Sequence, residues 1–231
     1  MSAAQQTAEE VRSVYIERMG QELGELFHAT SEELTQIHWR WNEYRTLFGE
    51  KPSRIDLMNE AAPFFFRIIH DVLFEDTMLA IARLVGPIKS AGKSNLSIER
   101  LLPLLSDPKF RDEVQILVQQ ARHAASFTHD YRNRRIAHRD LDLTLGKSAK
   151  MLPVVTRDNI EKCLSILRDI LDRIEGVYCK AHTAYAYSPS GWGAKSLLYV
   201  IRDGLLRRNE KHACWNRLER HEDDINPPGE I

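Results

Sequence analysis

The sequence predicts an all-helical fold, and three observations support this class. Apolar residues recur at spacings of three and four along almost the whole chain, which is the period of an amphipathic helix. Alternating β-branched residues, which are typical of strands, are nearly absent. The 231 residues are 43 % hydrophobic, enough to bury a sizeable core. We expect an N-terminal helical hairpin over residues 1–50, a helical domain over 51–220 and a disordered tail over 221–231.

Two helices are expected in the N-terminal segment. The first begins near Thr7 and keeps one apolar face as far as Leu26. The second begins near Thr30, because Thr30 and Glu33 have the spacing of a capping box, and it ends at Gly49. These two helices are expected to pack as a hairpin on the rest of the bundle.

The most apolar element follows a break at Lys51-Pro52-Ser53, where Ser53 is a candidate cap, and it continues to Leu84. Pro63 has no backbone N–H, so it either kinks this helix or begins a second one. Phe64-Phe65-Phe66 is expected mainly in the core. Three consecutive side chains cannot all point inward on a helix, however, so one of them is a candidate contact with a partner subunit.

The second half of the chain continues the helical pattern. Gly86-Pro87 ends the apolar helix, and residues 89–94 are expected to form a mobile surface loop. Asp107 and Pro108 have the residue types of a helix cap and first turn, so a long helix begins there and runs through residues 132–138 to Gly146. The other helices are expected over residues 97–105, 156–177 and 193–215.

Composition excludes several classes of protein. The formal net charge is −1, which does not indicate a strongly basic nucleic-acid binder. Three scattered cysteines are too few for a disulfide framework, and apolar runs are interrupted by charge before the roughly 20 residues of a membrane span. Gly92-Lys93-Ser94 lacks the leading glycine of a phosphate loop. We therefore expect a cytoplasmic protein with no membrane contact, no metal and no cofactor; the cysteines are Cys163, Cys179 and Cys214.

Positive charge is concentrated in one segment. Residues 122–139 contain five arginines and three histidines against one acid, whereas residues 1–62 contain eleven acids and six basic residues. Within the basic segment, Arg132 and His138 have complementary chemistry, since arginine binds a phosphodiester through paired hydrogen bonds and histidine moves protons near neutral pH. Cleaving RNA without a metal requires these two abilities, because the ribose 2′-hydroxyl is itself the nucleophile.

The motif suggests roles for three residues. His138 is the candidate acid or base, Arg132 the candidate phosphate clamp, and Asn133 a residue that can orient either one. A single histidine is one group short of separate acid and base roles. Positions 132 and 138 also point roughly 120° apart on a straight helix, where Arg134 would share a face with His138. Either the helix begins, bends or loosens near Asp130, or Arg132 wraps round, or two protomers combine and supply the second histidine.

The same residues also have a purely structural interpretation. Arg134, Arg135 and Arg139 have the spacing of solvated helix charges, and His138 can be a partly buried histidine with one hydrogen bond. Spacing by itself does not distinguish this interpretation from a catalytic one.

The stretch from Tyr131 to Leu141, YRNRRIAHRDL, resembles the signature of the HEPN superfamily: arginine, then asparagine, aspartate or histidine, and histidine a few residues later. It is most similar to the AbiU-type abortive-infection branch. The similarity extends to residues 57–65 and 79–84 and covers roughly Ile55 to Tyr185. The resemblance implies that the domain is an antiparallel HEPN-type bundle, to which the N-terminal hairpin and the last helix are additions.

The resemblance also implies a homodimer with its motif at the subunit interface. Active relatives are metal-independent endoribonucleases of abortive-infection or toxin–antitoxin systems, in which an antitoxin or other defence protein is a further partner. Residues Arg132, Asn133 and His138 match the catalytic positions. Asp140 replaces a tyrosine that is characteristic of a nucleotidylated toxin branch, so that control is not predicted. RNA is expected to contact Arg134, Arg135 and Arg139. The alternative is a non-catalytic module that binds RNA or a protein partner.

Overall fold

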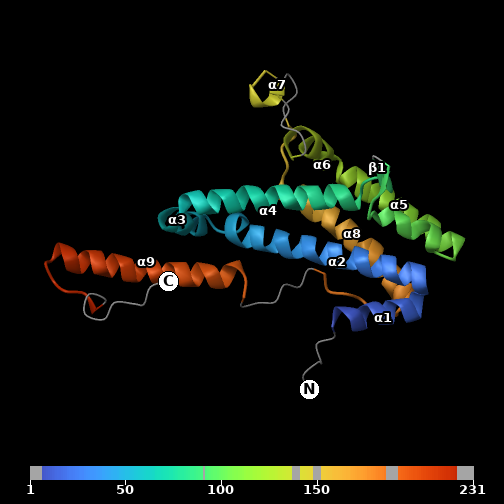
Figure 1. Cartoon of the computed structure of the whole chain (residues 1–231), viewed down its shortest axis with the longest axis horizontal. Coiled ribbons are helices and arrows are strands. Elements are labelled where there is room, and N and C mark those ends of the chain that lie inside the picture. The colour runs from blue at the N-terminus through green and yellow to red at the C-terminus, as the bar shows by residue number, and fades with distance from the viewer. Residues whose placement is uncertain (1–6, 91, 137–140, 148–151, 186–191, 223–231) are drawn as a thin grey trace. The chain divides into compact units, whose positions relative to one another are not determined.

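The structure is a computed structural model that describes residues 7–90, 92–136, 141–147, 152–185 and 192–222 (Figure 1). Its contacts divide the chain into two compact units. The first contains Met1–Trp41 and Phe74–Tyr187, and the second contains Asn42–Leu73 and Ser188–Ile231. Across the described residues, helices dominate and one short strand pair is present, so the all-helical class is confirmed. The predicted boundaries of the hairpin, the domain and the tail stay predictions, and residues 223–231 lie outside the described part.

The chain begins with α1 (Ala8–Met19) and α2 (Gln21–Tyr44). Thr7 and Glu10 form a reciprocal capping box at the start of α1. The break between the helices is Gly20, whose φ of 83° lies in the left-handed region that favours glycine. Gly24 then allows a close approach, since a Cβ at this position would lie 2.6 Å from the backbone of Ile16.

The predicted helix start at Thr30 is wrong. Thr30 is fully buried inside α2, and its Oγ1 donates a 2.7 Å hydrogen bond to the carbonyl of Leu26 one turn earlier. A hydroxyl used in this way cannot cap a helix, so the local capping pattern is overridden by burial. A π-helical turn, Arg45–Gly49, follows α2 and ends at the glycine that the sequence indicated.

The apolar central element consists of two helices, α3 (Pro52–Ala61) and α4 (Pro63–Leu84). Pro63 begins the second helix, which confirms one of the two predicted roles for this proline. Ser53 is not the cap of α3. Pro52 takes the first helical position, so the cap position falls on Lys51, whose side chain makes no capping hydrogen bond.

A short hairpin replaces the predicted surface loop. Strands β1 (Lys89–Ser90) and β2 (Lys93–Ser94) pair antiparallel, and Gly92 has a φ of 76° in the connection. Asn95 closes the base of the hairpin, because its backbone N–H donates to the Ile88 carbonyl at 3.0 Å. A 3₁₀ helix, Ile98–Leu104, lies within the segment expected to be helical.

The later helices include α5 (Pro108–Ala124), α8 (Arg157–Tyr178) and α9 (Ala194–Asn216). Helices α8 and α9 lie close to their predicted bounds, and α5 begins where expected. The Asp107 carboxylate accepts a hydrogen bond from the N–H of Lys109 at 3.0 Å and caps α5 as expected. Within the first unit, α5 packs along α8. The predicted continuation of α5 to Gly146 is wrong, because the helix stops at Ala124 and three shorter elements follow: α6 (Ser126–Tyr131), a π-helical turn (Arg132–Ile136) and α7 (Leu141–Thr144).

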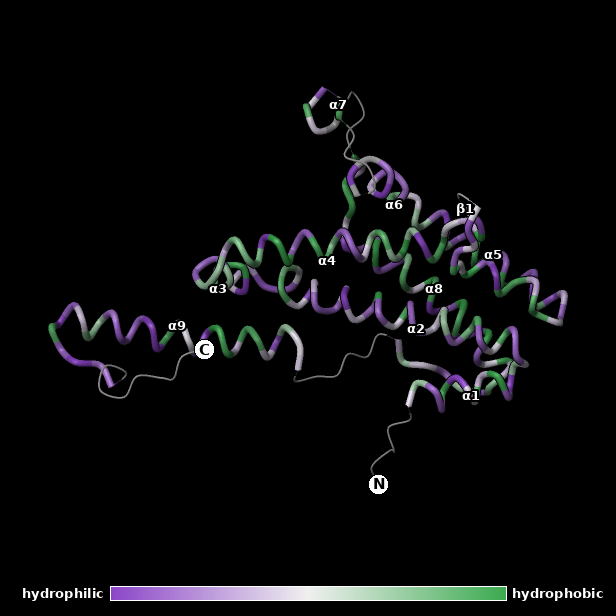
Figure 2. Tube along the Cα trace, viewed as in Figure 1, coloured by the Kyte–Doolittle hydropathy of each residue, from purple (hydrophilic) through white to green (hydrophobic). Residues whose placement is uncertain are grey.

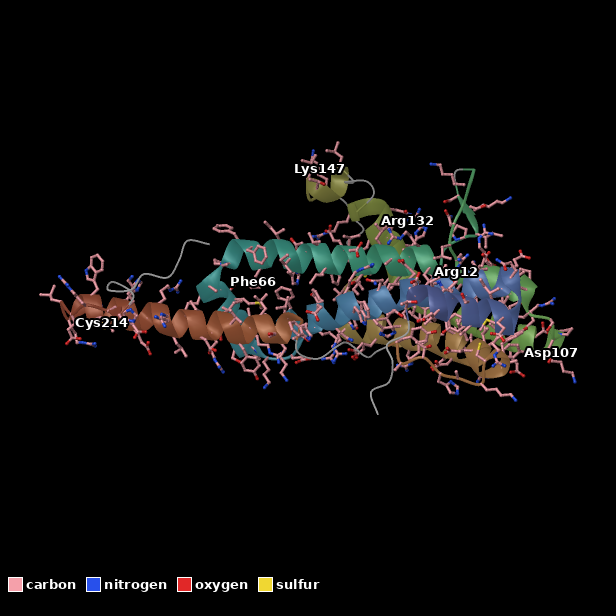
Figure 3. The ribbon with its side chains drawn as sticks, turned by 60° about the horizontal axis from the view of Figure 1, so that its bottom comes forward. Arg12, Phe66, Asp107, Arg132, Lys147 and Cys214 are labelled. Atoms are coloured by element: carbon pink, nitrogen blue, oxygen red, sulfur yellow. The ribbon has the colours of Figure 1, made fainter. Side chains whose placement is uncertain are left out.

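Hydrophobic residues recur along the helices of the chain (Figure 2), and each unit buries some of them. In the first unit, Phe27 of α2 and Ile81 of α4 are fully buried. In the second unit, Phe66 of α4, labelled in Figure 3, belongs to one cluster with Met58 of α3 and Leu198 of α9. No described helix is both long enough and apolar enough to cross a membrane.

Candidate functional site

The arginine-asparagine pair of the motif lies where the helix changes its hydrogen-bonding pattern. Thr128 of α6 is buried, and its Oγ1 donates to the Ala125 carbonyl at 2.7 Å, which fixes the start of this short helix. The backbone N–H of Arg132 donates to the carbonyls of both Thr128 and His129, and the π-helical turn begins at this residue. The helix therefore does loosen at the motif, as one of the three geometric alternatives predicted. Such turns are frequent at functional sites.

Arg132 forms part of the wall of two neighbouring pockets in the first unit. Their volumes are about 470 and 570 Å³, and both are also lined by Ala82, Gly86 and Pro87. The side chain is half-buried, and Figure 3 marks it at the end of α6. A guanidinium in this position can reach a ligand that occupies either pocket.

The charge of Arg132 has no counterion among the residues that the structure describes. Neighbouring arginines differ: Arg122 forms a bidentate pair with Glu99 at 3.1 and 2.5 Å, and Arg83 lies 3.5 Å from Glu33. Within the described part of the chain, this half-buried cation loses part of its hydration without gaining a carboxylate in exchange. An anion such as a phosphate would supply the missing partner through charge-assisted hydrogen bonds.

Arg135, a second arginine of the motif, differs from Arg132 because it has a carboxylate partner among the described residues. The Nε of Arg135 lies 2.9 Å from Oε1 of Glu75 on α4. One turn earlier, Tyr131 packs edge-on against Phe74, with ring centroids 5.9 Å apart. These two contacts anchor the π-helical turn on α4. The ion pair with Glu75 also partly neutralises Arg135, whose expected contact with RNA stays a prediction.

The other predicted site residues are described only in part. Arg134 lies in the π-helical turn, and its side chain is not described. His138 and Arg139 lie outside the described residues, so the distance from His138 to Arg132 is not part of the structure.

The structure identifies His129 as a candidate that the sequence analysis did not single out. Nδ2 of Asn133 lies 3.2 Å from Nε2 and 3.3 Å from Nδ1 of His129, so its N–H can donate to whichever ring nitrogen is unprotonated. His129 is exposed and lines the larger of the two Arg132 pockets. The partner of the Asn133 side chain among the described residues is thus His129 and not Arg132. The signal in the sequence was the spacing of four, which places both residues on one helix face.

The larger pocket is therefore lined by two side chains with catalytic chemistry, His129 and Arg132. The imidazole of His129 belongs to the side-chain type that most often transfers protons in catalysis, and the guanidinium of Arg132 can stabilise negative charge. Within the described part of the chain, no three histidine, cysteine, aspartate or glutamate side chains gather in a way that could hold a metal ion.

An all-helical domain with the Arg132-Asn133 pair on a loosened helix and His138 five residues after Asn133 has the fold class and the signature of HEPN proteins. The HEPN_AbiU2 family model, described as AbiU2, matches residues 20–188, and the chain therefore belongs to this family. Comparisons with curated proteins and with solved structures give no match. The matched range contains the whole motif and both Arg132 pockets.

Proposed function

We propose that this protein is a metal-independent endoribonuclease that acts in an abortive-infection or toxin–antitoxin system. The observation that carries the proposal is the half-buried Arg132 guanidinium, which lines two pockets and has no counterion among the described residues. Membership of the AbiU2 family supports the defence context. The basic segment around Arg132 supplies the charge that attracts a polyanion.

In the proposed reaction, the ribose 2′-oxygen forms a bond to phosphorus while the bond from phosphorus to the 5′-oxygen breaks. One imidazole removes the proton of the 2′-hydroxyl, and a second imidazole protonates the departing 5′-oxygen. His138 takes one of these roles, and His129 is our candidate for the other. Arg132 stabilises the charge on the non-bridging oxygens, and Asn133 orients the ring of His129. The products are a 2′,3′-cyclic phosphate and a 5′-hydroxyl.

Cleavage assays on the full chain test this proposal. Purified protein is incubated with tRNA and total RNA in EDTA, and the ends of the fragments are identified. We expect cyclic phosphate ends, and a loss of at least about 100-fold in rate for His138→Ala and Arg132→Ala. His129→Ala should also lower the rate, because it removes the proposed second proton-transfer group.

Arg157→Ala is the matched control, because Arg157 is an exposed arginine at the start of α8 that pairs with Glu161. Its cleavage rate should equal that of the wild type. If the wild type and His138→Ala were equally inert on every RNA, the enzymatic proposal would fail. Binding that weakens steeply with salt, without cleavage, would favour the alternative of a non-catalytic module. A homodimer with facing motifs, and a defence-system protein as a further partner, stay predictions of the resemblance.

A further inference from the structure

The β1–β2 hairpin forms part of the wall of the smaller Arg132 pocket. Ser90 and Ser94, one from each strand, line this pocket together with Arg132, and so does Asn95, which follows the second strand. Figure 3 shows the strand pair projecting beyond the neighbouring helices. An element that is distant from the motif in the sequence therefore borders the same cavity as the candidate phosphate clamp.

Hydrogen bonds fix the base of the hairpin. Nδ2 of Asn95 donates to the Pro87 carbonyl at 3.0 Å and to Oγ of Ser90 at 2.8 Å. Arg100 holds both ends of the hairpin, because its Nε donates to the Asn95 carbonyl at 2.6 Å and its Nη2 donates to the Ile88 carbonyl at 2.8 Å. A hairpin held in this way presents its side chains in a defined position, which reduces the entropy lost when a ligand binds.

The hairpin carries two exposed lysines, Lys89 and Lys93. In the strand register, Lys89 lies opposite Ser94 and Lys93 lies opposite Ser90. Side chains of directly opposite residues share one face, with Cβ atoms about 5 Å apart. Each lysine is therefore the cross-strand neighbour of a serine that lines the pocket. The flexible four-carbon stem of lysine lets the ammonium group reach a ligand at the pocket mouth.

Positive charge exceeds negative charge around this pocket. Among the described residues, neither lysine has a carboxylate partner. Glu33 is the acid among the described lining residues, and its Oε1 lies 3.5 Å from Nη2 of Arg83. Arg132 and the two lysines thus remain as cations without a described counterion. Several cations spaced around one cavity are complementary to the repeating phosphates of a single-stranded nucleic acid.

We propose that the β1–β2 hairpin is a second RNA contact, in which Lys89 and Lys93 bind phosphates that neighbour the phosphate held by Arg132. The inference rests on the proposed function, since it takes RNA as the ligand of the Arg132 pocket. Contacts to phosphates position the RNA but carry no sequence information. The hairpin should therefore strengthen the binding of single-stranded RNA of any sequence.

A purely structural role for the two lysines leads to a different expectation. Lysine on an exposed strand edge hinders pairing with a strand of another molecule. In that role, replacing Lys89 and Lys93 by alanine would promote aggregation and leave the affinity of the monomer for RNA unchanged. The two roles are therefore separated by measuring RNA affinity and association state on the same variants.

Binding to a single-stranded 2′-O-methyl oligoribonucleotide tests the hairpin without cleavage, because the methyl group blocks the 2′-oxygen nucleophile. Fluorescence anisotropy over a salt series in EDTA gives the dissociation constant and its salt dependence. The Lys89→Ala/Lys93→Ala variant should bind about 20-fold more weakly at about 0.1 M salt, and the slope of log K against log salt should fall by about 1.4, or about 0.7 for each lost phosphate contact. Lys89→Arg/Lys93→Arg keeps both charges, so it should stay within about threefold of the wild type.

Lys109→Ala/Lys162→Ala is the matched control. It removes the same charge from exposed positions of α5 and α8 that line neither Arg132 pocket. This control should bind the oligonucleotide as the wild type does. Light scattering should show the same association state for all variants, and circular dichroism verifies that each is folded.

The outcomes separate this inference from the proposed nuclease activity. A wild type that binds through the two lysines but cleaves no RNA would refute the nuclease and support the hairpin contact. The hairpin contact would be overturned by a double alanine variant that binds as tightly as the control, or by an arginine variant as weak as the alanine one. A wild type with no affinity for the oligonucleotide would also overturn it.

Discussion

His38 should make the stability of this protein depend on pH in a specific range. The side chain is buried in α2, and among the described residues its Nε2 has no hydrogen-bond partner. Burial, and secondarily the charge of Arg168, lowers the pKa of His38 from 6.5 to about 4. The folded protein therefore keeps this imidazole neutral at pH values at which the unfolded chain protonates it.

The direction in which stability changes with pH follows from the number of protons that His38 binds in the folded and unfolded chains. Between pH 6.5 and about 4 the unfolded chain binds more protons at this position than the folded chain, so stability falls as the pH falls through this window. Above pH 6.5 the imidazole of His38 becomes neutral in both the folded and the unfolded chain, so its titration no longer lowers the stability of the fold. At pH 5 the two pKa values correspond to a loss of about 2 kcal/mol in the free energy of unfolding.

Urea unfolding followed by circular dichroism at pH 7.5 and pH 5 measures this loss. His38→Leu removes the titrating group, so the variant should lose about 2 kcal/mol less than the wild type between the two pH values. Thr30→Val, at another buried position of α2, is the control. It should lower stability by a similar amount at both pH values. If His38→Leu retained the full wild-type dependence on pH, the explanation by burial of a neutral imidazole would be refuted.

Three further predictions concern packing and reactivity. Gly24→Ala should lower stability by about 2 kcal/mol, because the new Cβ would lie 2.6 Å from the backbone of Ile16, and thermal unfolding measures the change. Gly204→Ala in α9 should instead raise stability by about 0.5 kcal/mol, since no described atom beyond the adjacent residues and the backbone of its own helical turns lies within 4 Å of that Cβ; equal losses at both glycines would contradict the packing argument. The fully buried Cys163 should resist Ellman's reagent at pH 8, because burial raises the pKa of its thiol to about 12. Cys163→Ala should therefore show the wild-type thiol count when folded and one thiol fewer in denaturant, whereas a lower count in the folded state would disprove this.

Helix ends were predictable where the signal was local. Asp107 precedes a proline and caps α5 through a bond to a residue two positions later. Thr156 caps α8 through Asn159, three positions later, near the predicted start. Such bonds form between neighbours in sequence, so the pattern contains the information.

The same type of signal was misleading at Thr30. Its spacing to Glu33 is that of a cap, yet the residue is buried in the middle of α2 and bonds back to Leu26. The close approach of α1 at Gly24 is a tertiary contact, and no window of a few residues contains it. Burial therefore decided the outcome against local propensity.

In the candidate site, too, local patterns were predictable from the sequence and tertiary contacts were not. Arg132 and Asn133 were identified from the motif, and the spacing of His129 to Asn133 was available but unused. The partner of Arg135 could not be inferred, because Glu75 lies sixty residues earlier and only folding brings the two together. The sequence thus indicated the chemistry of the site, while the pairing of Arg135 with Glu75 depends on tertiary contacts.

The π-helical turn at Arg132–Ile136 has a consequence for insertions and deletions. Hydrogen bonds from residue i to i+5 enclose one residue more than those of an α-helix, so the turn has the form of a single-residue insertion into a regular helix. Removing one residue after Arg132 would restore the regular helical pattern and shorten the spacing from Arg132 to His138 by one residue. The length of this segment therefore constrains the motif as strictly as the identity of its residues. A one-residue deletion here should be more damaging than a conservative substitution at any single position of the turn.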